Sequence, residues 1–216
     1  MRNKELTGLL FAGVMAVALS GCSGASDIEF ADTDAAKAAM NHARSIYLEG
    51  NYDAVNQKTD ILADGKVAGY LNRKTVSING ETWFRYDFVT DEWINEDGDD
   101  YIAGNTYGYY DADGNCLGYA QLRSMQQDDE YYYYFMDAEG NLKNYRIEEN
   151  GYYAWDNDGN VIATGDWHSD FRISFMDDAC HVQIDMKDDA TTQMDFMDKM
   201  VMYILLFDEA EFWLRD

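Results

Sequence analysis

The sequence predicts an α+β fold that is mostly β, in which a curved antiparallel sheet, built as a meander of hairpins, has an N-terminal and a C-terminal helix packed on it. Three observations lead to this prediction. Turn-forming dipeptides that end in glycine recur at short intervals between residues 64 and 159. The segments between them are rich in β-branched and aromatic residues, as strands are. On either side of this region, apolar residues recur at spacings of three and four, which is the period of a helix.

The first helix is expected at the beginning of the domain. Thr33 or Asp34 can act as its N-cap, and Gly50 can end it. One apolar stripe follows the helical spacing and contains three alanines, which would let the helix lie close to its packing partner. The stripe consists of Ala36, Ala39, Met40, Ala43, Ile46 and Tyr47.

The second helix is expected near the C-terminus, with Asp189 or Thr191 as its N-cap and Asp195 in its first part, where a carboxylate meets the positive end of the helix dipole. Its apolar stripe contains Met194, Met197, Val201 and Ile204. Residues 207–216 fit a helix or a last strand equally well, because apolar and polar residues also alternate there.

The region between the helices is predicted to form successive antiparallel hairpins. The segment from Cys180 to Met186 alternates apolar and polar residues, which is typical of a half-buried strand, and this places His181 on the polar face. The predicted turns are Asp64-Gly65, Asn79-Gly80, Asp97-Gly98, Asp113-Gly114, Glu139-Gly140, Asn150-Gly151 and Asp158-Gly159.

Three of these turns share the pattern Asp-x-x-Gly-Asn, starting at Asp111, Asp137 and Asp156. With Tyr110 before the first aspartate, the unit resembles the YD repeat of bacterial wall-associated proteins. The other interpretation is turn chemistry, since aspartate can accept hydrogen bonds from its own backbone while glycine accepts a positive φ. We favour turn chemistry, because the spacing between the copies is irregular.

The first residues are typical of a signal peptide: a basic start, an uncharged apolar run from Leu6 to Leu19, and small residues. The run is short for a membrane span, which needs roughly 20 residues. Leu19-Ser20-Gly21-Cys22 resembles the lipobox of bacterial lipoproteins. The resemblance implies that residues 1–21 are removed and that Cys22 is diacylated on sulfur. This lipid then anchors the chain in the membrane of the bacterial cell envelope, outside the cytoplasm. The alternatives are an ordinary signal peptide and an uncleaved anchor.

The chain length suits one domain after the signal peptide. Residues 22–31 are predicted to be a lipidated tether, and residues 32–216 a single sheet-plus-helices domain. At 47% hydrophobic residues the chain can bury a core. Its net charge of −25 argues against nucleic acid as a partner, because phosphates would be repelled.

The motifs that the sequence lacks predict that the protein is not an enzyme and has neither a cofactor nor a metal site. The sequence has no nucleophile elbow, phosphate loop or zinc-ligand spacing. Cys180 and His181 are adjacent, so on a strand their side chains point to opposite faces. Cys116 and Cys180 can form a disulfide outside the cytoplasm, or they can be two buried thiols.

The predicted ligand contacts come from an aromatic strand and the methionine-rich helix. The layout of helix, meander and helix resembles the lipoprotein-carrier (LolA/LolB-like) half-barrel, and this resemblance implies an apolar cavity that holds acyl chains. We therefore expect a lipid-anchored protein that holds a lipid or another apolar or amphipathic ligand between sheet and helices. The alternative is a surface protein that binds glycan or protein through exposed aromatic residues. The expected ligand contacts are Tyr131, Tyr133, Phe135, Met194, Met197 and Val201.

Overall fold

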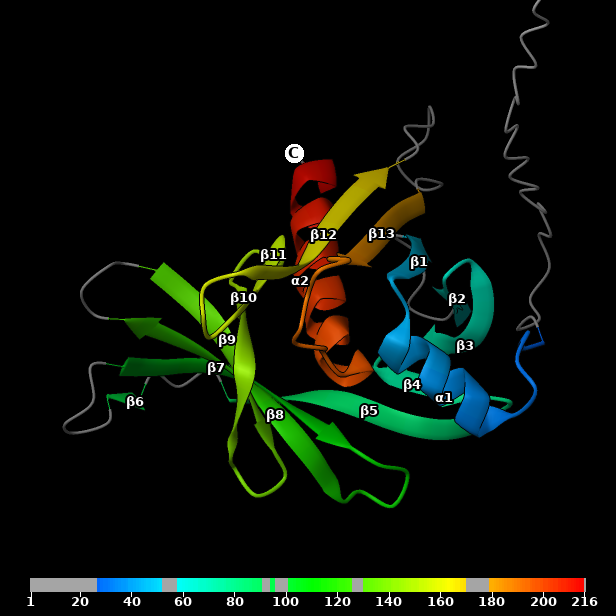
Figure 1. Ribbon diagram of the computed structural model, residues 1–216, viewed down its shortest axis with the longest axis horizontal. Helices are drawn as coiled ribbons and strands as arrows, with labels where there is room; N and C mark the ends of the chain where they lie inside the picture. The colour runs from blue at the N-terminus through cyan, green and yellow to red at the C-terminus, as the bar shows by residue number, and fades with distance from the viewer. Residues whose placement is uncertain are drawn as a thin grey trace, which may run out of the picture.

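The computed structural model describes residues 27–51, 58–90, 94–95, 101–125, 130–169 and 179–215 (Figure 1). These residues form antiparallel strands and two helices. The elements are α1 (Thr33–His42), β1 (Ser45–Asn51), β2 (Lys58–Ala63), β3 (Lys66–Asn72), β4 (Thr75–Ile78), β5 (Glu81–Thr90), β6 (Ile94–Asn95), β7 (Tyr101–Tyr110), β8 (Cys116–Met125), β9 (Glu130–Asp137), β10 (Leu142–Glu148), β11 (Tyr153–Asp156), β12 (Val161–Ser169), β13 (Ala179–Met186) and α2 (Phe196–Arg215).

The sheet closes on itself as an antiparallel barrel. Strands β1 to β5 form one meander and β7 to β13 form another. Pairing of β1 with β13 joins the two meanders, and pairing of β5 with β7 closes the ring, which contains twelve strands. Strand β6 adds to β7 beside this ring. The predicted mostly-β content is confirmed, but the predicted open curved sheet with helices packed on it is wrong. Closure depends on pairs of residues that are distant in the chain, such as Phe88 with Tyr107, and no local sequence pattern predicts such pairs.

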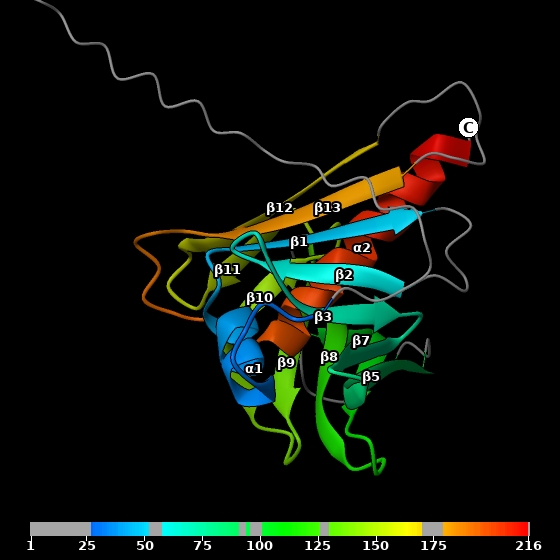
Figure 2. The ribbon, with the colours of Figure 1, turned by 90° about the vertical axis from the view of Figure 1, so that its right-hand side faces the viewer.

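Helix α2 lies in the interior of the barrel, with strands on several sides of it in two perpendicular views (Figures 1 and 2). Five consecutive residues, 198 to 202, are completely buried. Because successive helical residues are about 100° apart, five of them cover every face of the helix. The side chains of Trp83 and Phe196 stack across this interior, with ring centroids 5.4 Å apart. Helix α2 therefore forms the centre of the hydrophobic core.

Close approach of α2 to the barrel wall depends on Gly165 of β12. A Cβ atom at this position would lie 2.5 Å from Cδ1 of Leu206 and 2.8 Å from the backbone oxygen of Gly151. Both distances are shorter than van der Waals contact, so a larger residue would push the helix or the neighbouring turn away. Glycine at position 165 thus sets how near α2 lies to β12.

The helix boundaries differ from the predicted ones. Helix α1 ends at His42 rather than Gly50, because residues 45–51 pair with β13 and β2 as strand β1. Its N-cap is Asp32, whose carboxylate accepts a hydrogen bond from the amide of Ala35 at 2.8 Å. Helix α2 begins at Phe196, after the caps predicted for it, and it is helical through Arg215. The helical alternative for residues 207–215 is therefore correct.

The predicted hairpin turns are confirmed wherever the structure describes them. Six of the seven glycines have positive φ values, and Asp97-Gly98 lies outside the described residues. In the turn at Asp111 the carboxylate accepts hydrogen bonds from the amides of Asp113 and Asn115 at 3.0 and 2.8 Å. It also accepts one from the side-chain amide of Asn115, which is the main reason that the pKa of Asp111 lies below its usual value. Asp137 and Asp156 repeat this arrangement.

Candidate functional site

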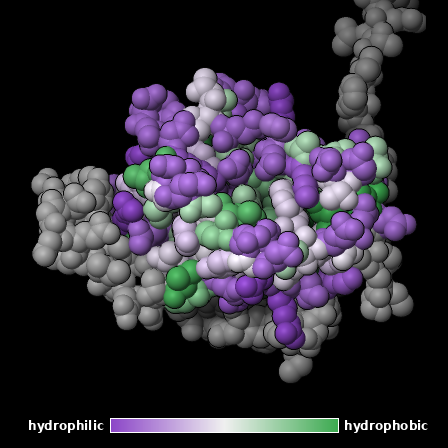
Figure 3. Space-filling model, turned by 90° about the horizontal axis from the view of Figure 1, so that it is seen from below, coloured by the Kyte–Doolittle hydropathy of each residue, from purple (hydrophilic) through white to green (hydrophobic). Residues whose placement is uncertain are grey.

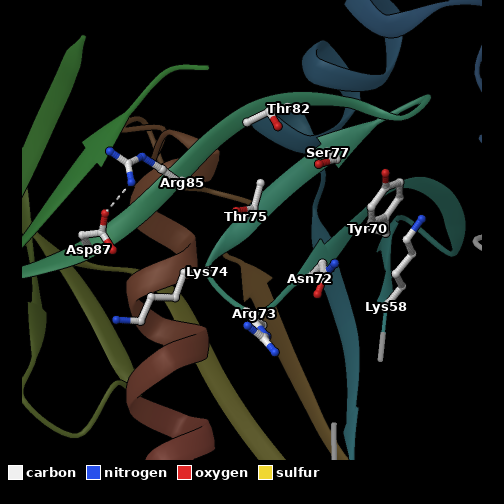
Figure 4. Close-up of a pocket in the computed structure, with 10 residues that line it drawn as sticks. All are labelled: Lys58, Tyr70, Asn72, Arg73, Lys74, Thr75, Ser77, Thr82, Arg85 and Asp87. Carbon is white, nitrogen blue, oxygen red and sulfur yellow. Dashed lines mark ion pairs between the residues drawn. The ribbon is translucent and has the colours of Figure 1, made fainter. Parts of the chain in front are cut away.

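A polar groove lies on the outer face of strands β2 to β5 (Figure 4). Its volume is about 670 Å³, which is within the usual range of ligand sites. Its walls carry cationic, hydroxyl and amide groups and one carboxylate, without an aliphatic side chain. The lining residues are Lys58, Tyr70, Asn72, Arg73, Lys74, Thr75, Ser77, Thr82, Arg85 and Asp87.

Strand register places much of the groove lining in two rows that cross the sheet. One row runs from Tyr70 through Ser77 to Thr82 on β3, β4 and β5, and the register continues it to Asp60 on β2. The other begins at Lys58 on β2 and continues through Asn72, Thr75, Arg85 and Tyr110 on β3, β4, β5 and β7. Neighbouring strands are about 4.8 Å apart, so the second row is roughly 19 Å long. A row of this length suits an extended ligand that lies across the strands.

Two cationic side chains of the second row, Lys58 at its first position and Arg85 beside its last, lie next to aromatic rings. The ammonium group of Lys58 lies 4.4 Å from the ring centroid of Tyr70. The guanidinium group of Arg85 lies 5.3 Å from the ring centroid of Tyr110. Arg85 also pairs with Asp87 at 3.1 Å, but both side chains are about half exposed. An exposed pair of this kind contributes about 1 kcal/mol or less, so it leaves Arg85 available for a ligand.

The turn between β3 and β4 supplies two further cations, which Figure 4 shows at one edge of the groove. Arg73 has a φ of +56°, a left-handed conformation that side chains with a Cβ atom rarely adopt. Two-residue hairpin turns with positive φ favour asparagine and glycine, yet this turn is Arg73-Lys74. The turn therefore places a cation at a position where a residue with a Cβ atom carries backbone strain, and such strain is common at functional sites.

Sequence reasoning did not identify this groove, although a signal was present. Of the sixteen lysines and arginines in a chain of net charge −25, five lie between Lys58 and Arg85. Only strand pairing shows that four of them face one groove. The local excess of positive charge in an acidic chain is therefore the sequence feature from which this groove could have been predicted.

The residues predicted to contact a ligand come together in the interior of the barrel. Tyr133 and Phe135 of β9 are buried in the hydrophobic core with Met194 and Val201, and Tyr131 and Met197 are partly buried against the same cluster. These contacts fit a packed core, and a ligand-binding role for them stays a prediction. On the other face of β9, the rings of Tyr132 and Tyr134 lie beside the guanidinium groups of Arg146 and Arg123.

Buried charged groups anchor α2 to the barrel. Asp198 is fully buried and accepts hydrogen bonds from the ammonium of Lys143 and the hydroxyl of Tyr145, both at 2.6 Å. Burial raises the pKa of Asp198, although Lys143 acts in the opposite direction. The ammonium of Lys199 donates to the backbone oxygens of Met40 and Asn41 at 3.3 and 2.8 Å. These contacts explain the position of α2 and lie away from the groove.

Several sequence predictions concern residues that the structure does not describe. Leu19-Ser20-Gly21-Cys22 lies outside the described residues, so lipidation stays a prediction. The thiol of Cys116 donates to the backbone oxygen of Gly118 at 3.7 Å, whereas the side chain of Cys180 is not described, and the disulfide stays a prediction as well. Within the described ranges, neither helix is long and apolar enough to span a membrane.

The surface seen from below is mainly hydrophilic, and its hydrophobic residues form small separate areas (Figure 3). Among the residues whose exposure is described, four large hydrophobic side chains are exposed: Phe88, Val89, Leu142 and Tyr153. In the same part of the chain, no three His, Cys, Asp or Glu side chains gather as a metal site would require. Comparisons with protein families, curated proteins and solved structures found no match.

Proposed function

We propose that this chain is a lipid-anchored binding protein of the bacterial cell envelope that binds an anionic glycan in the groove on β2 to β5. The observation that carries the proposal is the concentration of Lys58, Arg73, Lys74 and Arg85 in one groove of a strongly acidic chain. The proposal develops the alternative drawn from the sequence, a surface protein that binds glycan or protein.

Electrostatics favour an anionic ligand and orient it. A chain of net charge −25 repels an acidic polymer over most of its surface. The groove offers four cationic side chains against the single carboxylate of Asp87. An anionic ligand is therefore steered to this place, since complementary charge contributes mainly to specificity and to the association rate.

The chemistry of the lining favours a glycan over an apolar ligand or a protein. Protein interfaces usually have an apolar centre, whereas this groove has no aliphatic side chain. The hydroxyl groups of Thr75 and Thr82 and the amide of Asn72 can exchange hydrogen bonds with sugar hydroxyls. The other hypothesis, an apolar ligand between sheet and helices, has less support because α2 and its buried neighbours occupy that space.

The test compares two probes with the same sugar backbone, an oligogalacturonate and its methyl ester, in which a neutral methyl ester replaces each charged carboxylate. The full-length chain in detergent should bind the acid form more tightly, and added salt should weaken this binding. In the Lys74→Gln and Arg85→Gln variants, the dissociation constant should rise about tenfold, because a hydrogen bond to a charged group contributes about 1.5–3 kcal/mol. Lys66→Gln is the matched control, since Lys66 is exposed and basic but outside the groove lining.

Two outcomes would contradict the proposal. Equal binding of the acid and ester forms would show that charge is not recognised. An effect of Lys66→Gln as large as that of Lys74→Gln would show a diffuse charge effect rather than binding in the groove.

A further inference from the structure

The turn between β3 and β4, which carries Arg73 and Lys74 at the edge of the groove, is held by a single residue of β5, Tyr86. The backbone N–H of Tyr86 donates a hydrogen bond to the backbone oxygen of Lys74 at 2.9 Å. The hydroxyl group of Tyr86 donates to the backbone oxygen of Arg73 at 3.2 Å. Both carbonyl groups of this two-residue turn therefore accept a hydrogen bond from the same residue.

Tyr86 connects the groove to the hydrophobic core. Its chain neighbours Arg85 and Asp87 line the groove on the outer face of the barrel. Because successive strand residues point to opposite faces, the ring of Tyr86 points to the interior, where it is only 8% exposed. Burial raises the pKa of Tyr86, and the charge of Asp208 adds to this effect, so the hydroxyl group keeps its proton and acts as a donor.

The contact of Tyr86 with the turn sets the direction of the peptide group between Arg73 and Lys74. This peptide is trans, so its C=O and N–H groups point in opposite directions. Its carbonyl group points to the Tyr86 hydroxyl and thus toward the interior of the barrel. The backbone N–H of Lys74 therefore points to the outer face, on which the groove lies. Backbone N–H groups in turns can bind anions in this way.

We propose that Tyr86 is a positioning residue of the groove, which fixes the turn so that the backbone N–H of Lys74 donates a hydrogen bond to an anionic group of the ligand. The φ of +56° at Arg73 carries strain, so the turn needs such support to keep this conformation. A hydrogen bond to a charged acceptor is stronger than one between neutral groups. Tyr86 has this role only if the groove binds an anionic glycan, so the proposal rests on the proposed function and adds a contact to it.

The first test is the binding of oligogalacturonate to Tyr86→Phe, which removes the hydroxyl group and keeps the ring in the core. In the full-length chain in detergent, the dissociation constant should rise about tenfold, the size of effect expected for a hydrogen bond to a charged group. Tyr132→Phe is the matched control, since the Tyr132 hydroxyl donates to Glu130 at 2.7 Å on β9, outside the groove lining. Circular dichroism checks that both variants are folded.

Combined variants separate positioning of the turn from a general effect on the fold. Lys58 lies at the far end of the second row, on β2, so in Lys58→Gln the change Tyr86→Phe should weaken binding by the same factor as in the unaltered chain. In Lys74→Gln the factor should be smaller, because effects of residues that act on a shared contact do not add. Equal factors in the two backgrounds would show that Tyr86 acts on the whole barrel, and would overturn the proposal.

The second test observes the backbone N–H of Lys74 in the unaltered chain by nuclear magnetic resonance. The chain has eight lysines, so labelling lysine with nitrogen-15 gives a simple spectrum, and Lys74→Gln identifies the signal of position 74. Saturating oligogalacturonate should move this proton signal to lower field and leave that of Lys66 in place. In Tyr86→Phe at saturation, the displacement should be much smaller.

The outcomes distinguish this proposal from the proposed function. If the unaltered chain does not bind oligogalacturonate, both are overturned. If it binds, but the Lys74 signal does not move or Tyr86→Phe binds equally well, the role of Tyr86 is overturned and the proposed function stands.

Discussion

Asn41 and Lys199 connect the end of α1 to the beginning of α2 from positions 158 residues apart. The ammonium of Lys199 donates a hydrogen bond to the backbone oxygen of Asn41 at 2.8 Å. The side-chain oxygen of Asn41 in turn accepts a hydrogen bond from the amide of Phe196 at 2.8 Å. The first contact satisfies a carbonyl at the C-terminal end of α1, and the second satisfies an amide at the N-terminal end of α2. Each helix thus caps the other.

Asn41→Ala should therefore destabilise the protein by about 1–2 kcal/mol, which is typical for the loss of a helix cap. The measurement is urea unfolding followed by circular dichroism. Asn144→Ala is the matched control, because Asn144 has an exposed side chain on β10. Equal free energies of unfolding in the two variants would mean that the amide of Phe196 finds another acceptor.

The buried ammonium of Lys199 predicts a pH dependence of stability. Burial lowers its pKa from 10.5 to about 8. Between these values the unfolded state holds a proton that the folded state has lost, so stability rises with pH through this window. The gain attributable to Lys199 is up to about 3 kcal/mol, since one pKa unit corresponds to 1.36 kcal/mol.

Unfolding of the unaltered chain and of Lys199→Met should therefore be compared at several pH values from 7 to about 10.5. Other lysines and tyrosines titrate in the same range, and the comparison cancels their contribution. The unaltered chain should gain stability relative to Lys199→Met as the pH rises above 8. A constant difference would show that the ammonium keeps an ordinary pKa.

Arg73→Gly should raise the stability of the protein and weaken its binding of the ligand. Glycine adopts the φ of +56° without the steric cost that a Cβ atom carries, roughly 1–2 kcal/mol. Part of this gain is offset by the greater freedom of glycine in the unfolded chain, so we expect about 1 kcal/mol of net stabilisation. The same variant should bind oligogalacturonate more weakly, because the groove loses a cation.

Thermal unfolding and probe binding of Arg73→Gly answer both parts of this prediction. Lys74→Gln is the comparison. It removes the neighbouring cation but leaves Arg73 in place, so the backbone strain at position 73 is unchanged. If Arg73→Gly lowers stability, contacts of the arginine side chain outweigh its backbone strain.

The sequence alone determined the parts of this fold that depend on local chemistry. Hairpin turns at Gly65, Gly80, Gly114, Gly140, Gly151 and Gly159 could be predicted because glycine adopts positive φ and aspartate or asparagine satisfies nearby amides. The alternation of Val182 and Ile184 with polar residues identified β13, since a strand presents alternate residues to opposite faces.

Tertiary structure decided the rest, because it depends on pairs that are distant in the chain. Closure of the barrel requires β5 to meet β7 and β1 to meet β13. The end of α1 at His42 follows from that second pairing, which draws Ile46 and its neighbours into a strand despite their helical spacing. The groove likewise arises from register between strands, and a register is set by the packing of the whole barrel rather than by any one segment.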